Sequence, residues 1–91
     1  MTNVDEPSQT RRKSPVQIRY EILEFLFYNA GKHSRTWLWR RATQLSYDDF
    51  LKYLQYLKQK GLVEELDEGI CLASQGRDVY LKLRDAITSL F

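Results

Sequence analysis

Residues 32–60 read KHSRTWLWRRATQLSYDDFLKYLQYLKQK, and GLVEEL follows directly at residues 61–66. The first part predicts a short helix over about residues 35–43, after which Leu45-Ser46 marks a break. A longer amphipathic helix then runs to Gly61, which is a typical C-terminal stop. This order of helix, turn, helix and strand is the skeleton of the predicted fold.

The second of these helices carries its own start signal and a clear buried face. Ser46 is the predicted N-cap and Asp49 stands at N3, which makes an aspartate version of the capping box. The apolar residues that follow have the i, i+3, i+4, i+7 spacing of one buried helix face. They are Phe50, Tyr53, Leu54 and Leu57.

A further helix is predicted before this tract. Ser14 is a candidate N-cap, Pro15 suits the first helical position, and the pattern continues to about Asn29 before Gly31 ends it. Apolar residues form two stripes on this helix and leave only a narrow polar band. A surface helix of a monomer needs a single apolar face, so we expect a second cover, which another subunit would supply.

The chain after Gly61 predicts a hairpin and a long helix. Residues 62–66 and 70–73 form two short strands around the turn at 67–69, and a helix covers residues 74–91. Apolar residues of this last helix are spaced 3, 4, 3, the period of paired helices. They are Tyr80, Leu83, Ile87 and Leu90. The predicted fold class is mainly α with a small β-hairpin: a winged helix-turn-helix with a long C-terminal helix.

Length and composition favour one small domain. The 91 residues are 43% hydrophobic, enough for a single core. Residues 1–13 are predicted to be a disordered tail with a basic end, and residues 14–91 to be the winged-helix domain with a C-terminal dimerisation helix. Cys71 is the single cysteine, so no internal disulfide can form. Without a signal sequence or an apolar spanning segment, we expect a cytoplasmic location.

Charge is distributed unevenly along the chain. Residues 1–10 contain two acids and no base, a balance of −2. Residues 11–60 contain eleven Lys or Arg against four Asp or Glu, a balance of +7, and residues 61–91 contain three against six, a balance of −3. The middle of the chain therefore suits a polyanion that the C-terminal third would repel.

Two stretches carry a family resemblance. RATQLSYDDFLKYLQYLKQKGLVEE at residues 41–65 and ICLASQGRDVY at residues 70–80 resemble archaeal winged-helix regulators, over about residues 16–85. The resemblance implies a dimeric DNA-binding protein whose last helix makes the dimer. Two features depart from the family pattern. Ala73 stands where Thr is usual, which predicts that the cap of the last helix moves to Ser74, and the turn before Leu45 is one residue longer.

The exposed face of the 46–59 helix is the predicted reading surface, lying in the major groove of DNA. Lys52 suits a guanine edge or a phosphate, and Gln55 suits an adenine. The alternative is an ordinary solvated helix face, which Asp48 and Asp49 favour because acids repel phosphate and suit a helix N-terminus. The candidate base contacts are Ser46, Tyr47, Asp48, Lys52, Gln55 and Tyr56.

Basic residues before that helix are the predicted phosphate contacts, with surface solubility as the alternative. They are Arg11, Arg12, Lys13, Lys32, Arg35, Arg40 and Arg41. The first three could reach an adjacent minor groove, and plain charge of the tail is the equal alternative. His33 is expected at the surface, with phosphate as a candidate neighbour. The hairpin sequence EELDEG holds four acids in six residues, so we predict that the wing tip does not contact the DNA backbone.

The partners predicted from the sequence are double-stranded DNA and a second copy of the chain. The dimer interface is expected to use Tyr80, Leu83, Ile87, Leu90, Val16 and Tyr20. A winged-helix module for protein–protein contact is the alternative, favoured by the acidic wing and by Trp37, Trp39 and Tyr56. With one His, one Cys and no phosphate loop, we expect no enzyme activity, metal, cofactor or small-molecule effector.

Overall fold

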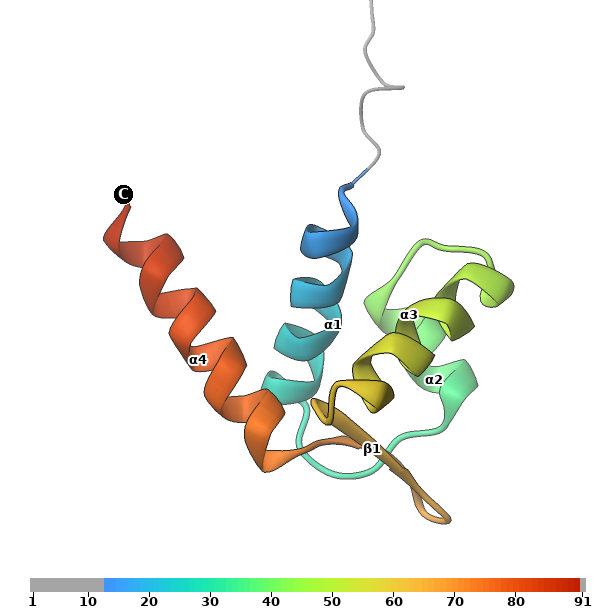
Figure 1. The fold of residues 1–91 in the computed structure, drawn as a ribbon. Helices are drawn as coiled ribbons and strands as arrows, with labels where there is room; N and C mark the ends of the chain where they lie inside the picture. The colour runs from blue at the N-terminus through green and yellow to red at the C-terminus, as the bar shows by residue number, and fades with distance from the viewer. Residues whose placement is uncertain (1–12, 91) are drawn as a thin grey trace, which may run out of the picture.

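The computed structural model describes residues 13–90, and four helices and one hairpin follow one another in that part of the chain (Figure 1). They are α1 (Pro15–Tyr28), α2 (Arg35–Ala42), α3 (Tyr47–Gln59), β1 (Val63–Leu66), β2 (Gly69–Leu72) and α4 (Ser74–Ser89). This order confirms the predicted winged helix-turn-helix with a C-terminal helix. The predicted tail, including Arg11 and Arg12, lies outside the described residues except for Lys13.

Serine side chains fix the starts of the first three helices. The hydroxyl oxygens of Ser14, Ser34 and Ser46 each accept a hydrogen bond from a backbone N–H three residues later, at 3.1, 3.1 and 3.2 Å. Each bond satisfies a donor that has no partner inside the helix. The caps at Ser14 and Ser46 confirm the sequence prediction, and Gly61 ends α3 with a φ of 74°.

The start of α4 differs from its prediction. Ala73 occupies the N-cap position with no side-chain cap, and Ser74 is already the first helical residue. The backbone at this position is held by a tertiary contact, because the N–H of Ala73 donates to the carbonyl oxygen of Leu62 at 3.0 Å. At Gly76 an added Cβ would come within 1.9 Å of that same carbonyl oxygen. The absence of a side chain at Gly76 thus lets α4 approach the end of the α3–β1 connection.

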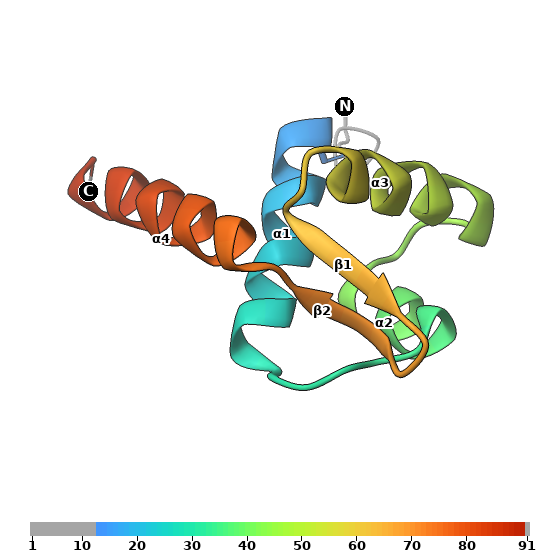
Figure 2. The ribbon, with the colours of Figure 1, turned by 60° about the horizontal axis from the view of Figure 1, so that its bottom comes forward.

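The hairpin pairs Val63 with Leu72 and Leu66 with Gly69, which leaves a two-residue turn instead of the predicted three (Figure 2). The segment before α2 joins β2, because His33 and Ile70 exchange two backbone hydrogen bonds of 3.0 and 2.7 Å. Gly69, with a φ of 136°, lies so close that a Cβ there would be 2.8 Å from His33 backbone atoms.

His33 is therefore a packing residue, which corrects the expectation of a phosphate-facing surface histidine. Its side chain is half-buried, and its ring stacks on Trp37 with centroids 4.0 Å apart. Its Nε2 lies 2.9 Å from the carbonyl oxygen of Asn29. The ring is held between the end of α1 and the start of α2 because the bridge to Ile70 fixes its backbone.

Tyr80 belongs to the core of the protomer, and its prediction as a dimer-interface residue is wrong. Its side chain is 0% exposed, with its ring 4.7 Å from that of Phe27 and 5.3 Å from that of Tyr20. Its hydroxyl donates to Glu24 Oε2 at 3.2 Å, and burial raises its pKa. The 3, 4, 3 spacing of apolar residues suggested a dimer contact for Tyr80. The first turns of α4 instead pack on α1 of the same chain, and that contact also requires apolar residues on α4.

The second half of α4 diverges from α1, so that the two helices form a V (Figure 1). Apolar side chains are exposed on both arms: Val16 at 67%, Leu83 at 38%, Ile87 at 43% and Leu90 at 78%. Burying such side chains is favourable, and the V leaves them without a cover in the single chain. Within residues 13–90, none of the helices combines the length and apolar character needed to cross a membrane.

Candidate nucleic-acid interface

Helix α3 stands between two hollows of the surface. The first, of about 1040 Å³, lies between α3, the start of α1 and the α2–α3 turn. The second, of about 520 Å³, lies on the other side of α3 and reaches Arg35. Lys52 and Tyr56 line both hollows, and of the two only Lys52 is exposed, whereas Tyr56 is half-buried. A projecting helix with space on either side has the shape that can enter a DNA major groove.

The six predicted base-contact residues are not equivalent on this helix. Asp48, Lys52 and Gln55 are exposed, and Lys52 Nζ lies 3.9 Å from Asp49 Oδ1. Tyr47 is half-buried, with its ring edge-on to Trp39 at 5.2 Å, so its main contact is packing. The remaining two also have structural contacts.

Ser46 uses its hydroxyl oxygen as the cap of α3 and remains exposed. Tyr56 is half-buried beneath the guanidinium of Arg19, whose Cζ lies 3.9 Å from the ring centroid. The sequence pattern did not single out Arg19, because its place beside α3 depends on the packing of α1 against that helix. Lys52 and Gln55 are thus exposed predicted residues with hydrogen-bond donors suited to base edges and without a capping role.

Arg40 and Arg41 lie exposed at the end of α2, as their predicted role requires. The Cζ of Arg40 is 5.7 Å from the Trp39 ring and that of Arg41 is 4.9 Å from the Trp37 ring. The indole N–H of Trp39 donates to the carbonyl oxygen of Leu45 at 2.7 Å, which ties α2 to the turn before α3. The rings limit where these guanidinium groups move and leave their N–H donors available to an anion.

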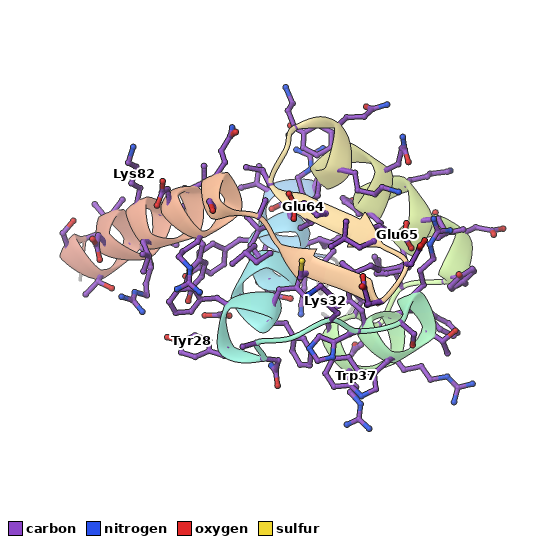
Figure 3. All side chains as sticks on the ribbon, turned by 90° about the horizontal axis from the view of Figure 1, so that it is seen from below. Tyr28, Lys32, Trp37, Glu64, Glu65 and Lys82 are labelled. Carbon is purple, nitrogen blue, oxygen red and sulfur yellow. The ribbon has the colours of Figure 1, made fainter. Side chains whose placement is uncertain are left out.

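Arg35 lies exposed at the start of α2 and forms an ion pair with the hairpin, so a carboxylate already holds the guanidinium that was predicted to contact phosphate. Its Nε and Nη2 donate to the two carboxylate oxygens of Glu65 at 2.6 and 2.7 Å, and Lys58 Nζ approaches Oε1 at 2.8 Å. Hydrogen bonds from Arg35 and then Lys58 lower the pKa of Glu65 from 4.5 to about 2. Figure 3 shows Glu65 on the hairpin beside α2 and α3. Its carboxylate compensates the two positive charges, while the Arg35 side chain remains 43% exposed.

The remaining predicted phosphate contacts have different surroundings. Lys13 is paired with Glu21, with Nζ and Oε1 2.7 Å apart, whereas Lys32 is exposed (Figure 3). On the hairpin, Glu64, Asp67 and Glu68 are exposed while Glu65 is half-buried. The turn of the hairpin is therefore acidic. The half-buried carboxylate of Glu65, on β1, forms the ion pairs with Arg35 and Lys58.

Fold and surface together define a class of protein. It is a winged helix-turn-helix domain in which α3 has a hollow on each side and arginines lie beside the α2–α3 turn. The model of one winged helix-turn-helix family matches residues 11–90, and the chain belongs to that family. No curated protein matches the sequence. Domains of this kind are typically DNA-binding modules of regulators and not enzymes.

Proposed function

We propose that the chain is a sequence-specific, double-stranded DNA-binding transcriptional regulator of archaeal type that acts in the cytoplasm as a homodimer. In this proposal α3 enters the major groove and presents Lys52 and Gln55 to base edges. Arg40 and Arg41 bind the phosphate backbone beside the groove, and Lys32 extends that contact. The observation that carries the proposal is the exposed pair of arginines adjoining a projecting α3.

Electrostatics support the proposed orientation. Residues 11–60 have a balance of +7, and within the described part of that segment the arginines of α2 lie near the start of α3. The acidic hairpin turn would be repelled by phosphate, so the domain is expected to dock with that turn away from the backbone. Contacts to the backbone fix the position of α3, and contacts to bases provide the sequence preference.

The exposed apolar V supports the proposed homodimer. Leu83 and Ile87 lie on α4, Leu90 is its C-cap, and Val16 lies in the first turn of α1. A second copy would bring an identical set of side chains, which makes a self-complementary interface around a two-fold axis. Tyr20 is half-buried against Tyr80 and would lie at the floor of this interface. Two α3 helices related in this way would read half-sites about one DNA turn, ~34 Å, apart.

DNA binding is tested by selection from random duplex DNA, followed by titration of the selected duplex at about 50 and 200 mM salt. The proposal expects enrichment of one sequence with two related half-sites and a large loss of affinity at the higher salt. Retention of no duplex, or binding that does not depend on salt, overturns it.

The dimer is tested by sedimentation at micromolar concentration with Ile87→Glu as the variant. Wild type is expected to sediment as a dimer and Ile87→Glu as a folded monomer, because a charge in the V is costly to bury. Thr88→Glu provides the matched control on the next, exposed position of α4. A wild type that is monomeric at all concentrations contradicts the homodimer.

A protein–protein interaction module is the second candidate, and the acidic hairpin turn is the feature that favours it. Glu64, Asp67 and Glu68 present carboxylates that a basic partner would accept. Reversing Arg40 and Arg41 to Glu discriminates between the candidates. The exchange should abolish DNA binding by a regulator and leave partner binding by an interaction module unchanged.

A further inference from the structure

Arg19 of α1 is a half-buried arginine that packs against aromatic rings. Its guanidinium lies over the rings of two α3 tyrosines, with Cζ 3.9 Å from the centroid of Tyr56 and 5.9 Å from that of Tyr53. Its Nε is buried and has no hydrogen-bond partner among residues 13–90. An atom buried to this extent is out of reach of a phosphate, so an anion that enters beside α3 would meet the terminal Nη groups of Arg19.

The first hollow beside α3 contains an uncompensated positive charge. Five charged residues line it: Lys13, Arg19, Glu21, Asp49 and Lys52. Lys13 pairs with Glu21 at 2.7 Å, and Lys52 has Asp49 at 3.9 Å. Arg19 is left without a carboxylate in the described part of the chain, so the hollow carries a net charge of about +1 on a partly dehydrated guanidinium.

The second hollow has no arginine that is free of a carboxylate partner among the described residues. Its cations are Arg35, whose fork is occupied by Glu65, and Lys52, which also belongs to the first hollow. A helix lying in a major groove has a phosphate chain on each side. The two sides of α3 are therefore electrostatically different, and the side toward α1 has the available guanidinium.

We propose that Arg19 forms a phosphate-binding site on the α1 side of α3, in which its Nη groups donate to one backbone phosphate of DNA that enters the first hollow. The site rests on the proposed DNA-binding function and adds to it a contact from α1. The ring of Tyr56 holds the guanidinium plane, so little side-chain freedom is lost when the phosphate binds. Tyr56 acts in this arrangement as a positioning residue for Arg19.

The test compares Arg19→Gln with wild type on the selected duplex over a series of salt concentrations. A phosphate contact predicts about tenfold weaker binding and a log–log salt slope smaller by about 0.9 for each protomer. Base preference is expected to stay the same, because a phosphate carries no sequence information. Arg77→Gln is the matched control, because Arg77 also lies over an aromatic ring, Phe27 at 5.1 Å, but on α4.

Each outcome separates the site from the function it rests on. Wild-type binding with an unchanged slope in Arg19→Gln overturns the site and leaves DNA binding standing. A wild type that binds no duplex overturns both. If Arg19→Gln melts below the assay temperature, Arg19→Lys replaces it. Arg19→Lys keeps the charge but loses the planar fork, so the site predicts a nearly unchanged slope with several-fold weaker binding, and unchanged affinity overturns it.

Discussion

The helix-turn-helix and the hairpin that follows it are adjacent in the sequence and opposite in charge. The end of α2 presents Arg40 and Arg41 outward, whereas the hairpin turn presents Asp67 and Glu68. Ion pairs join the two regions where Glu65 of β1 binds Arg35 at the start of α2 and Lys58 at the end of α3. An acidic hairpin can therefore support a basic binding surface by holding the helices that carry it.

The largest effect on DNA binding is expected when the end of α2 is made acidic like the hairpin turn. Arg40→Glu/Arg41→Glu is expected to weaken duplex binding by more than about 100-fold, because two phosphate contacts become repulsions in each protomer. Filter binding at constant salt measures the effect. Arg77→Glu/Lys82→Glu makes the same change of charge on α4 and serves as the control (Figure 3 labels Lys82). Equal losses in both variants would show that only net charge matters.

The role of α3 can be sharpened by removing its exposed donors. Lys52→Ala/Gln55→Ala is expected to lower the discrimination between selected and random duplex by about tenfold, since base contacts provide about 1–3 kcal/mol each. Competition binding with the two duplexes measures it. Gln75→Ala on α4 is the control. Affinity that falls equally for both duplexes would assign these residues to phosphate contact instead.

The junction between the two regions is tested by Glu65→Gln. The free energy of unfolding should fall by about 1–2 kcal/mol, because two charge-assisted interactions are lost. Duplex affinity should rise by about threefold, because Arg35 and Lys58 become free cations. Glu64→Gln on the same strand is the control, since Glu64 is exposed. Urea unfolding and titration measure the two effects, and lower affinity of Glu65→Gln would contradict the compensation of charge.

Acid should remove the same junction in the wild type. The folded-state pKa of Glu65 is about 2 against an ordinary 4.5, so its stabilising contribution is complete above pH 4.5 and is lost as the pH falls toward 2. The difference in unfolding free energy between wild type and Glu65→Gln should be constant at about pH 5–7 and shrink below that range. Urea unfolding across this range measures it. A difference that is independent of pH contradicts the shifted pKa.

The smallest effect is expected at the hairpin turn. Asp67→Asn/Glu68→Gln should raise duplex affinity by less than about twofold at ~0.15 M salt, because charges away from the backbone are screened. Thermal melting should not change, as both side chains are exposed. A larger rise would place the turn close to the DNA.

Much of the fold follows from local sequence signals, and the site follows only in part. Ser14, Ser46 and Gly61 mark helix ends through bonds within a few residues, and the structure confirms each one. The patterns that misled involve distant partners. Tyr80 fits a paired-helix spacing but is covered by α1, and Arg35 is basic but is bound by Glu65, thirty positions along the chain.

The sequence by itself determined the order of the elements, the buried face of α3 and the concentration of positive charge before Gly61, because these depend on residue type and spacing. Only the tertiary structure decided which charges remain available. In the folded chain Arg35 is paired with Glu65, and Arg19 lies over Tyr56. Gly76 lets the start of α4 pack closely against the backbone of Leu62. The physical reason is that compensation and burial depend on distances between elements, and those distances exist only after the helices have packed.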